Sequence, residues 1–163
     1  MLFYTGIKRT AADVAETYVN NIEAKEKQLC KMMDFVEEGI SIVTGKHDLK
    51  QFGKLLHEAW QVKRTFSDKV SNSEVDDLYE ISRKAGAIGG KLTGAGGGGF
   101  LLLFVPPSRK KKVQECLKNL IYVPLKIDFS GSQVIFFDPQ EDYSLIEKER
   151  DQKKIKKFRE LSD

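Results

Sequence analysis

The sequence has little cysteine, histidine or proline, and it contains no long apolar run. Cys30 and Cys116 lie far apart, and the two histidines complete no ligand set with them, so we expect neither a disulfide framework nor a bound metal. The longest apolar run, residues 100–107, is too short to cross a bilayer, and no signal-peptide pattern opens the chain. These absences predict a soluble cytoplasmic protein with reduced thiols and no membrane partner.

Net charge is also low, since 27 basic residues face 24 acidic ones and leave +3. That balance provides no electrostatic footprint for nucleic acid. The basic run of residues 109–112 lacks interleaved aromatic residues, which favours a solvated helix face. Residues 99–104 faintly resemble an RNA-binding strand, but the basic residue expected before Gly99 is absent. Phe100, Leu102 and Phe104 would share one face of this strand, which we expect to be a core face. We therefore expect no nucleic-acid partner.

Apolar residues make up 40% of the chain, and their spacing predicts a first strand followed by four helices. Helical spacing runs from about Thr10 to Gly45 in two stretches. Asp48 is expected to cap a third helix. A fourth begins at Ser73, where Ser-Glu-Val-Asp resembles a capping box with Ser73 as the cap, and ends at Gly86. The segments that read as strands are 2–5, 88–93, 100–105, 121–127 and 132–137, the last two joined in a hairpin at Gly131, and a short helix follows the prolines at 106–107. This order predicts an α+β fold whose mostly antiparallel sheet is covered by helices on one side.

Residues 86–99 contain eight glycines in fourteen positions, and residues 94–99 carry nothing larger than a methyl group. A dinucleotide-binding fingerprint is excluded because a strand follows the loop instead of a helix. A Walker A loop is excluded because Lys91 precedes the main cluster and is followed by Leu92. Two alternatives stay open: a tight hairpin, or a loop that packs against a ligand or a second phosphate-binding loop and lines an anion site with its amides.

Residues 57–72 form a second notable stretch. Trp60 lies one helical turn from His57 and from Arg64, and Lys63 stands beside them. Cations at a helix end complement its dipole, and the same two groups would hold a sugar phosphate. Two interpretations of this stretch therefore stay open: a solvated basic helix end with a core tryptophan, or a phosphate site.

Residues 90–100, Gly-Lys-Leu-Thr-Gly-Ala-Gly-Gly-Gly-Gly-Phe, resemble the third signature motif of the GHMP kinases, the superfamily of galactokinase, homoserine kinase, mevalonate kinase and phosphomevalonate kinase. Residues 2–11, 60–72 and 131–135 resemble its bacterial heptose 7-phosphate kinase subgroup. The likeness covers about residues 1–137. We therefore expect a GHMP kinase carboxy-terminal domain there, and a charged tail, helical or disordered, over residues 138–163; a partner-binding helix is the alternative for the tail.

The resemblance implies a ferredoxin-like two-layer sandwich, an antiparallel sheet with helices on one face, that completes the cleft of an ATP- and Mg²⁺-dependent sugar or sugar-phosphate kinase. It places the acceptor's existing phosphate at Lys63, Arg64 and Lys91, because a guanidinium suits a phosphate. Contacts with the nucleotide or the phosphate loop are expected at Thr93, Gly94, Ala95, Gly96, Gly97 and Gly98.

The family's amino-terminal phosphate loop, of the Gly-Leu-Gly-Ser-Ser type, and its acidic base do not occur in these 163 residues. We therefore assign no catalytic residue and no metal ligand, expect no tightly bound cofactor, and expect no turnover of ATP by this chain alone. The expected partner is an amino-terminal kinase half, or a second copy, that covers the face left open. The alternative is a stand-alone ferredoxin-like module that binds a small anionic ligand through the glycine loop.

Overall fold

A computed structural model of the chain describes residues 1–19, 22–135 and 142–152. They belong to two compact units, Met1–Lys126 and Ile127–Asp163. The domain boundary predicted at residues 137–138 lies outside the described residues and stays a prediction. Among the helices that the structure describes, none combines the length and the hydropathy needed to cross a bilayer.

The first unit is built on a four-stranded sheet in which every neighbouring pair is antiparallel, in the order β2-β3-β1-β4. Its elements in chain order are β1 (Leu2–Tyr4), α1 (Ala11–Val19), η1 (Glu23–Lys25), α2 (Glu26–Thr44), α3 (Lys50–Arg64), α4 (Ser73–Ala85), β2 (Gly89–Leu92), β3 (Phe100–Phe104), η2 (Pro107–Arg109), α5 (Lys110–Cys116) and β4 (Ile121–Val123). With α4 leading into β2 and α5 joining β3 to β4, this is the ferredoxin-like strand order. The predicted α+β fold is confirmed.

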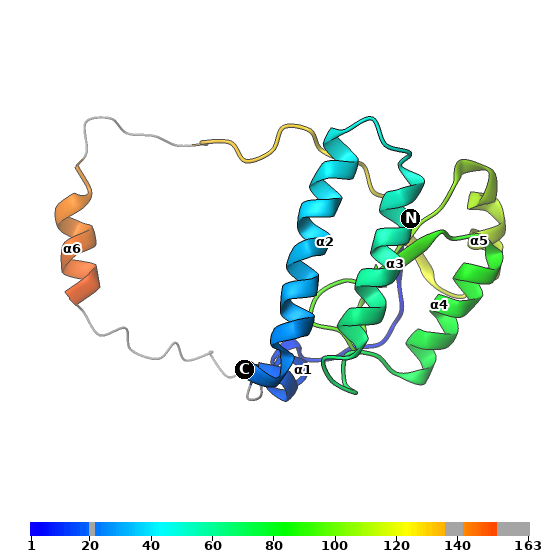
Figure 1. Ribbon diagram of the computed structural model, residues 1–163, viewed down its shortest axis with the longest axis horizontal. Helices are drawn as coiled ribbons and strands as arrows, with labels where there is room; N and C mark the ends of the chain where they lie inside the picture. The colour runs from blue at the N-terminus through cyan, green and yellow to red at the C-terminus, as the bar shows by residue number, and fades with distance from the viewer. Residues whose placement is uncertain (20–21, 136–141, 153–163) are drawn as a thin grey trace. The chain divides into compact units, whose positions relative to one another are not determined.

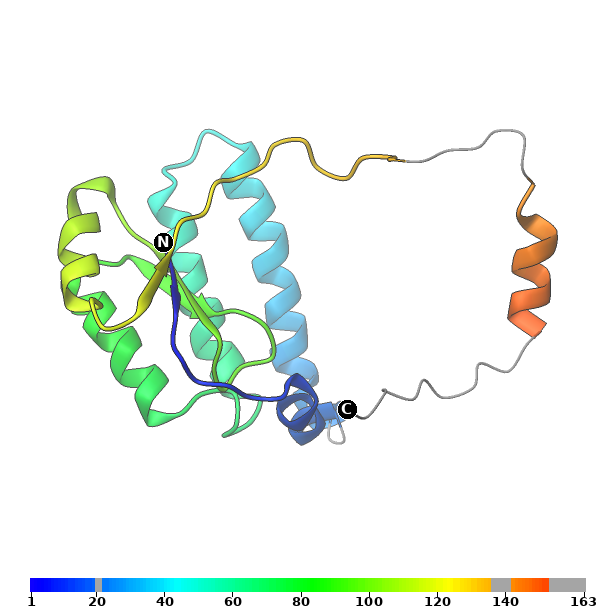
Figure 2. The ribbon, with the colours of Figure 1, turned by 180° about the vertical axis from the view of Figure 1, so that it is seen from behind.

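Side chains alternate along the strands and divide the sheet into a buried and a less buried face. Phe3, Leu92, Leu101 and Leu103 are buried, and they share one core with residues of α4 and α5, among them Val75, Tyr79, Val113 and Leu117. The strands lie in front of the helices in Figure 2, and the helices lie in front of the strands in Figure 1. The helices therefore form one layer and the sheet the other.

Helix α3 approaches β2 without intervening side chains. A Cβ added to Gly89 would lie 1.8 Å from the carbonyl oxygen of Gly53 on α3, so both backbones meet there. Helix α2 runs beside α3 (Figure 1) and packs on it through Phe35, Ile42 and Leu55, which form a second small core. Helix α2 also keeps five exposed apolar residues, Leu29, Met33, Val36, Ile40 and Val43, the last three of which line a groove against α3.

The helix ends agree with the sequence only in part. Gly86 ends α4 with φ 116°, as predicted. At the start of α3 the cap position is Leu49 instead of Asp48 and no side chain caps it, although the Asp48 carboxylate accepts from the Lys50 amide at 2.9 Å. The cap of α4, however, is Asn72 and not Ser73, because the Asn72 side chain accepts from the Val75 amide at 3.0 Å. Asn72 is the residue directly before the helix, and from that position its side-chain oxygen reaches the amide three residues later.

The strands predicted at the end of the domain are shorter or absent. Strand β4 ends at Val123, before Pro124, which has no amide to donate to a ladder. Residues 132–135 form no strand, so the hairpin predicted at Gly131 is wrong for the described residues, while residues 136–137 lie outside them. A β-branched apolar segment such as Val134-Ile135 needs a neighbouring strand to pair with, and no strand of the described residues pairs with it.

In the second unit, the structure describes one helix, α6 (Ser144–Gln152), within the residues predicted to form a charged tail. The Asp142 carboxylate accepts from the Ser144 amide at 3.0 Å, which fixes the start of this helix. The same hydrogen bonds from Ser144 hold the pKa of Asp142 below its ordinary value.

Candidate functional site

The glycine loop, residues 94–99, joins β2 to β3 and is held between two other segments of the first unit. On one side the Gly97 amide donates to the Val70 carbonyl at 2.8 Å. On the other side the Gly99 amide donates to the Ile7 carbonyl at 2.9 Å. Three segments that are far apart in the sequence therefore meet at this loop.

Further hydrogen bonds from side chains of neighbouring residues also hold the loop in place. The Asn72 amide group donates to the Gly97 carbonyl at 2.9 Å. The hydroxyl and the backbone amide of Thr5 both donate to the Gly99 carbonyl at 2.8 Å. The Thr93 amide donates to the Phe100 carbonyl at 2.8 Å and its hydroxyl does so at 3.2 Å. The loop is thus a hairpin, but one fastened to the rest of the fold.

Glycine is required in the middle of the loop because backbone atoms occupy the space beside it. A Cβ on Gly96 would lie 2.6 Å from the Val70 carbonyl oxygen, and one on Gly98 would lie 2.4 Å from that of Ile7. Gly94, in contrast, has φ +79° and no atom within 4 Å of an added Cβ. Part of the glycine run therefore serves the chain's own packing, and its first residue faces open space.

Several backbone amides of this loop have no hydrogen-bond acceptor within the described part of the chain. Those of Gly94, Ala95, Gly96 and Gly98 donate to no acceptor there, whereas those of Gly97 and Gly99 do. Successive amides in a loop that alternates the sign of φ are the donors of an anion-binding nest. The loop can therefore bind an anion chemically, as the second of the two sequence alternatives requires.

The cations predicted to bind the acceptor lie around the loop but are largely engaged. The Lys63 ammonium donates to the Gly94 carbonyl, and burial together with the nearby charge of Lys91 lowers the pKa of Lys63. Arg64 forms an ion pair with Asp76 on α4, with 2.6 Å between Nη2 and Oδ2. Lys91 is half-buried on β2 and lines an apolar groove between α2 and α3.

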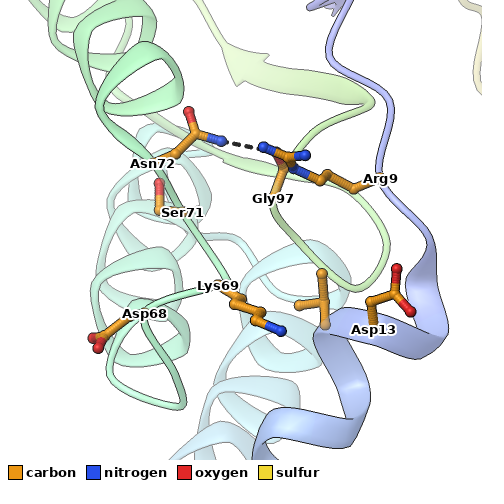
Figure 3. Close-up of a pocket in the computed structure, with 8 residues that line it drawn as sticks. Arg9, Asp13, Asp68, Lys69, Ser71, Asn72 and Gly97 are labelled. Atoms are coloured by element: carbon orange, nitrogen blue, oxygen red, sulfur yellow. Dashed lines mark hydrogen bonds between the residues drawn. The ribbon is translucent and has the colours of Figure 1, made fainter.

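A polar pocket of about 330 Å³ opens beside the middle of the loop (Figure 3). Its walls come from the segment after β1, the start of α1, the connection between α3 and α4, and the glycine loop. The lining residues are Arg9, Asp13, Val14, Asp68, Lys69, Ser71, Asn72 and Gly97.

Two cations of this pocket, Arg9 and Lys69, have no ion pair and no side-chain hydrogen bond to any residue that the structure describes. Figure 3 shows the Asp68 carboxylate directed away from both, whereas Asp13 stands across the pocket from Lys69. Sequence reasoning did not select Arg9 or Lys69. The available signal was that residues 2–11 and 60–72 both resemble the same kinase subgroup, which marks the two segments that the loop brings together.

His57 and Tyr79 form a separate polar pair under β2. The His57 Nδ1 lies 2.7 Å from the Tyr79 hydroxyl and the rings stack at an angle of 2°. Burial raises the pKa of Tyr79 to about 12, and burial together with the Arg83 charge lowers the pKa of His57. Trp60 is fully buried in the same core, as the interpretation of residues 57–72 as a helix end with a core tryptophan predicts. This pair connects α3 to α4, and neither residue lines the pocket beside the glycine loop.

Within the described ranges, no group of three or more His, Cys, Asp or Glu side chains is placed to hold a metal ion. The charged residues of the pocket provide two carboxylates, Asp13 and Asp68, and Figure 3 shows these directed differently. A Mg²⁺ site made by this part of the chain alone therefore does not fit the residues present.

Comparison with known proteins supports the same family as the motif in the glycine loop. The family model described as GHMP kinases C terminal matches residues 37–123, more than half of the 163 residues. The D-glycero-alpha-D-manno-heptose 7-phosphate kinase of Campylobacter jejuni is 31% identical over 98 residues, which cover 59% of this chain and 29% of that protein. The chain thus spans less than a third of this relative's length.

Solved structures with the same fold include mevalonate kinases. That of Leishmania major in complex with R-mevalonate has a TM-score of 0.60 at 24% identity, over 72% of this chain and 37% of that one. That of Methanococcus jannaschii has a TM-score of 0.60 at 26% identity, over 72% of this chain and 35% of that one. The first unit therefore matches about a third of each of these enzymes.

Proposed function

The chain belongs to the GHMP kinases, as residues 90–100 predicted, and from this premise we propose that it is the carboxy-terminal part of an ATP-dependent kinase acting on a sugar or sugar phosphate. The observation that carries the proposal is the glycine loop. It is held rigidly by Ile7 and Val70 while four of its amides stay without an acceptor among the described residues. Fixed amide donors stabilise the charge of a phosphoryl group without reorganising during its transfer.

A heptose 7-phosphate is the acceptor we favour. The support is the 31% identity to a kinase whose name specifies that substrate, together with two cations beside the loop, Arg9 and Lys69. ATP would place its phosphates against the amides of residues 94–98, and Mg²⁺ would accompany those phosphates. We propose a cytoplasmic location because Cys30 and Cys116 are both free thiols.

The proposed activity also needs groups that this chain does not contain, because no phosphate-cradling Gly-Leu-Gly-Ser-Ser stretch occurs in its sequence. We propose that an amino-terminal kinase half supplies them, and that the chain alone does not turn over ATP. The fraction of the relatives' length that is matched, 29% for the heptose kinase, favours this partner over a second copy. Sedimentation of the purified chain tests the choice, since a dimer that strengthens with concentration would instead support a second copy.

Nuclear magnetic resonance of the ¹⁵N-labelled chain tests the role of the loop. We expect ATP with Mg²⁺ to shift the amide signals of residues 94–99, because the β- and γ-phosphates contact these groups, and AMP to shift them much less. An equal response to AMP, or shifts confined to other segments, would contradict the proposal. An equal response to inorganic phosphate, with no phosphoryl transfer after addition of an amino-terminal half, would support the stand-alone anion-binding module.

A further inference from the structure

We propose that the apolar groove between α2 and α3 binds the hydrocarbon chain of a fatty acid, with the Lys91 ammonium as the partner of its carboxylate. None of residues 94–99 lines this groove. The inference therefore goes beyond the proposed kinase activity and does not depend on it.

The first argument is the chemistry of the groove's walls. Its volume is about 390 Å³, which is within the range of small-molecule sites. Every lining residue is apolar except Lys91 of β2; the apolar ones are Met32, Phe35, Val36, Gly39, Ile40 and Val43 of α2 and Phe52, Leu55, Leu56 and Ala59 of α3. A sugar or a nucleobase would find no hydroxyl, amide or carboxylate side chain to pair with its polar groups there. A hydrocarbon chain has no such groups to satisfy.

The second argument is the shape of the groove between these two helices, which lie side by side (Figure 1). Its lining residues on α2 run from Met32 to Val43, about 16 Å along the helix axis. Phe35 and Leu55 close the floor, since both are buried in the small core between α2 and α3. Ile40, in contrast, is 57% exposed. A long groove with a closed floor and exposed apolar sides fits a linear chain, whose binding would remove this apolar surface from water.

The third argument is the charge of Lys91. Its ammonium has no ion pair and no side-chain hydrogen bond to any residue that the structure describes. Burial, and then the charge of Lys91, lowers the pKa of Lys63, which already donates to the Gly94 carbonyl. Two cations therefore lie near each other, and an anion at Lys91 would relieve their repulsion. One free ammonium matches the single charge of a carboxylate.

The same charge argues against a second copy of the chain as the occupant. Such a copy would cover the groove with its own exposed apolar side of α2, formed by Leu29, Met33, Val36, Ile40 and Val43. None of these residues carries a carboxylate, so Lys91 would be covered without an anionic partner, which is unfavourable. A fatty acid brings its own anion.

Titration of the whole ¹⁵N-labelled chain with octanoate, hexanoate and octanol tests the inference, with the amide signals of Gly39 and Ala59 as reporters on the two helices that line the groove. We expect octanoate to bind about tenfold more tightly than hexanoate, because two further methylene groups are buried. We expect it to bind about fivefold more tightly than octanol, because octanol lacks the charge that pairs with half-buried Lys91.

Two pairs of variants locate the site. Lys91→Met should abolish the preference for octanoate over octanol while octanol still binds, whereas Lys54→Met, on the exposed side of α3, should leave the preference unchanged. Ile40→Gln should weaken octanoate about fivefold, because an apolar wall is lost. Its matched control is Met33→Gln, at an exposed apolar residue of the same helix that does not line the groove, and it should leave the affinity unchanged.

Saturation at one site with these losses would support the inference. Equal binding of hexanoate and octanoate, shifts confined to residues outside the groove, or a preference for octanoate that persists in Lys91→Met would overturn it. Tighter binding of octyl phosphate than of octanoate would overturn the choice of a carboxylate. A dimer that Ile40→Gln weakens, without any binding of octanoate, would assign the groove to a second copy instead. None of these results bears on the response of the loop amides to ATP, which tests the proposed function separately.

Discussion

The groups around the glycine loop fall into two sets that differ in what they contact. The bonded set consists of Gly96, Gly98, Lys63 and Arg64, each of which touches or pairs with another part of the chain. The free set consists of Arg9 and Lys69, whose charged groups line a pocket, and of Gly94, which faces open space where a side chain would stand although its carbonyl accepts from Lys63. Both sets have the same residue types, glycine and a basic pair. Residue type therefore does not decide the role; the presence of a partner does.

This difference separates architecture from binding. Arg64 and Ser71 both contact the Asp76 carboxylate at 2.6 Å, so the bonded set ties the end of α3 to the first turn of α4. A group that is already bonded stabilises the fold and gains little from a ligand. A free charge beside a rigid loop contributes nothing to folding and keeps its full interaction for a ligand. We expect substitutions in the two sets to have opposite signatures.

The largest difference is expected between two glycines. Gly98→Ala should lower the free energy of unfolding by about 3 kcal/mol, because its new Cβ would meet the Ile7 carbonyl oxygen. Gly94→Asn should lower it by less than about 1 kcal/mol, since asparagine tolerates positive φ and the space there is open. Urea denaturation of both variants measures these values. Equal losses would show that the loop is not packed more tightly on the side of Ile7.

A smaller contrast is expected between two arginines. Arg64→Met should destabilise the chain by about 1 kcal/mol, because the ion pair with Asp76 is about one-third exposed and hydrogen-bonded. Arg9→Met should change stability by less than about 0.5 kcal/mol, because no described partner is lost. Thermal unfolding compares the two directly. A stability loss at Arg9 as large as that at Arg64 would place Arg9 in the bonded set.

The fold could be predicted from the sequence where local signals suffice. The unbroken apolar run of residues 100–105 marks β3, and Gly86 marks the end of α4. The predicted core face of β3 is wrong, since Leu101 and Leu103 are buried in the core while Phe100 is 40% exposed.

The sequence failed where a partner decides the outcome. Residues 132–135 end in two β-branched residues typical of strands but pair with no strand that the structure describes. Asn72 caps α4 because its side chain, one residue earlier than predicted, meets the Val75 amide.

The candidate site shows the same limit. The glycine loop could be located from its composition alone, yet nothing in that composition says that Ile7 and Val70 lie against it. Arg9 and Lys69 come from the two segments that those contacts bring together, so their proximity is a tertiary fact. Likewise Lys63 and Arg64 read as available cations in the sequence, because their bonds to Gly94 and Asp76 depend on the fold.

The smallest expected effect is a change of stability with pH, and it concerns the hydrogen-bonded pair His57 and Tyr79, which lies away from the pocket. Burial lowers the pKa of His57, so below about pH 6.5 the unfolded chain binds a proton that the folded chain resists. Stability contributed by neutral His57 is complete above that pH and falls as the pH drops toward the folded pKa. His57→Gln should flatten the dependence of the free energy of unfolding on pH in this range. The contact that this substitution affects is the one between Nδ1 of His57 and the Tyr79 hydroxyl, at 2.7 Å, and Tyr79→Phe removes it from the other side.

Denaturation of the original chain and of His57→Gln at pH 7.5, 6.5 and 5.5 measures the effect as a difference, which cancels the other titrating groups. The difference should be smaller than the loss at Arg64, because His57 is only partly buried. Affinity for the phosphorylated heptose should not change with pH in this way, since His57 pairs with Tyr79 and does not line the pocket beside the glycine loop. If His57→Gln changes that affinity over the same pH range, a group that is bonded within the core also acts on binding, which contradicts the separation of architecture from binding.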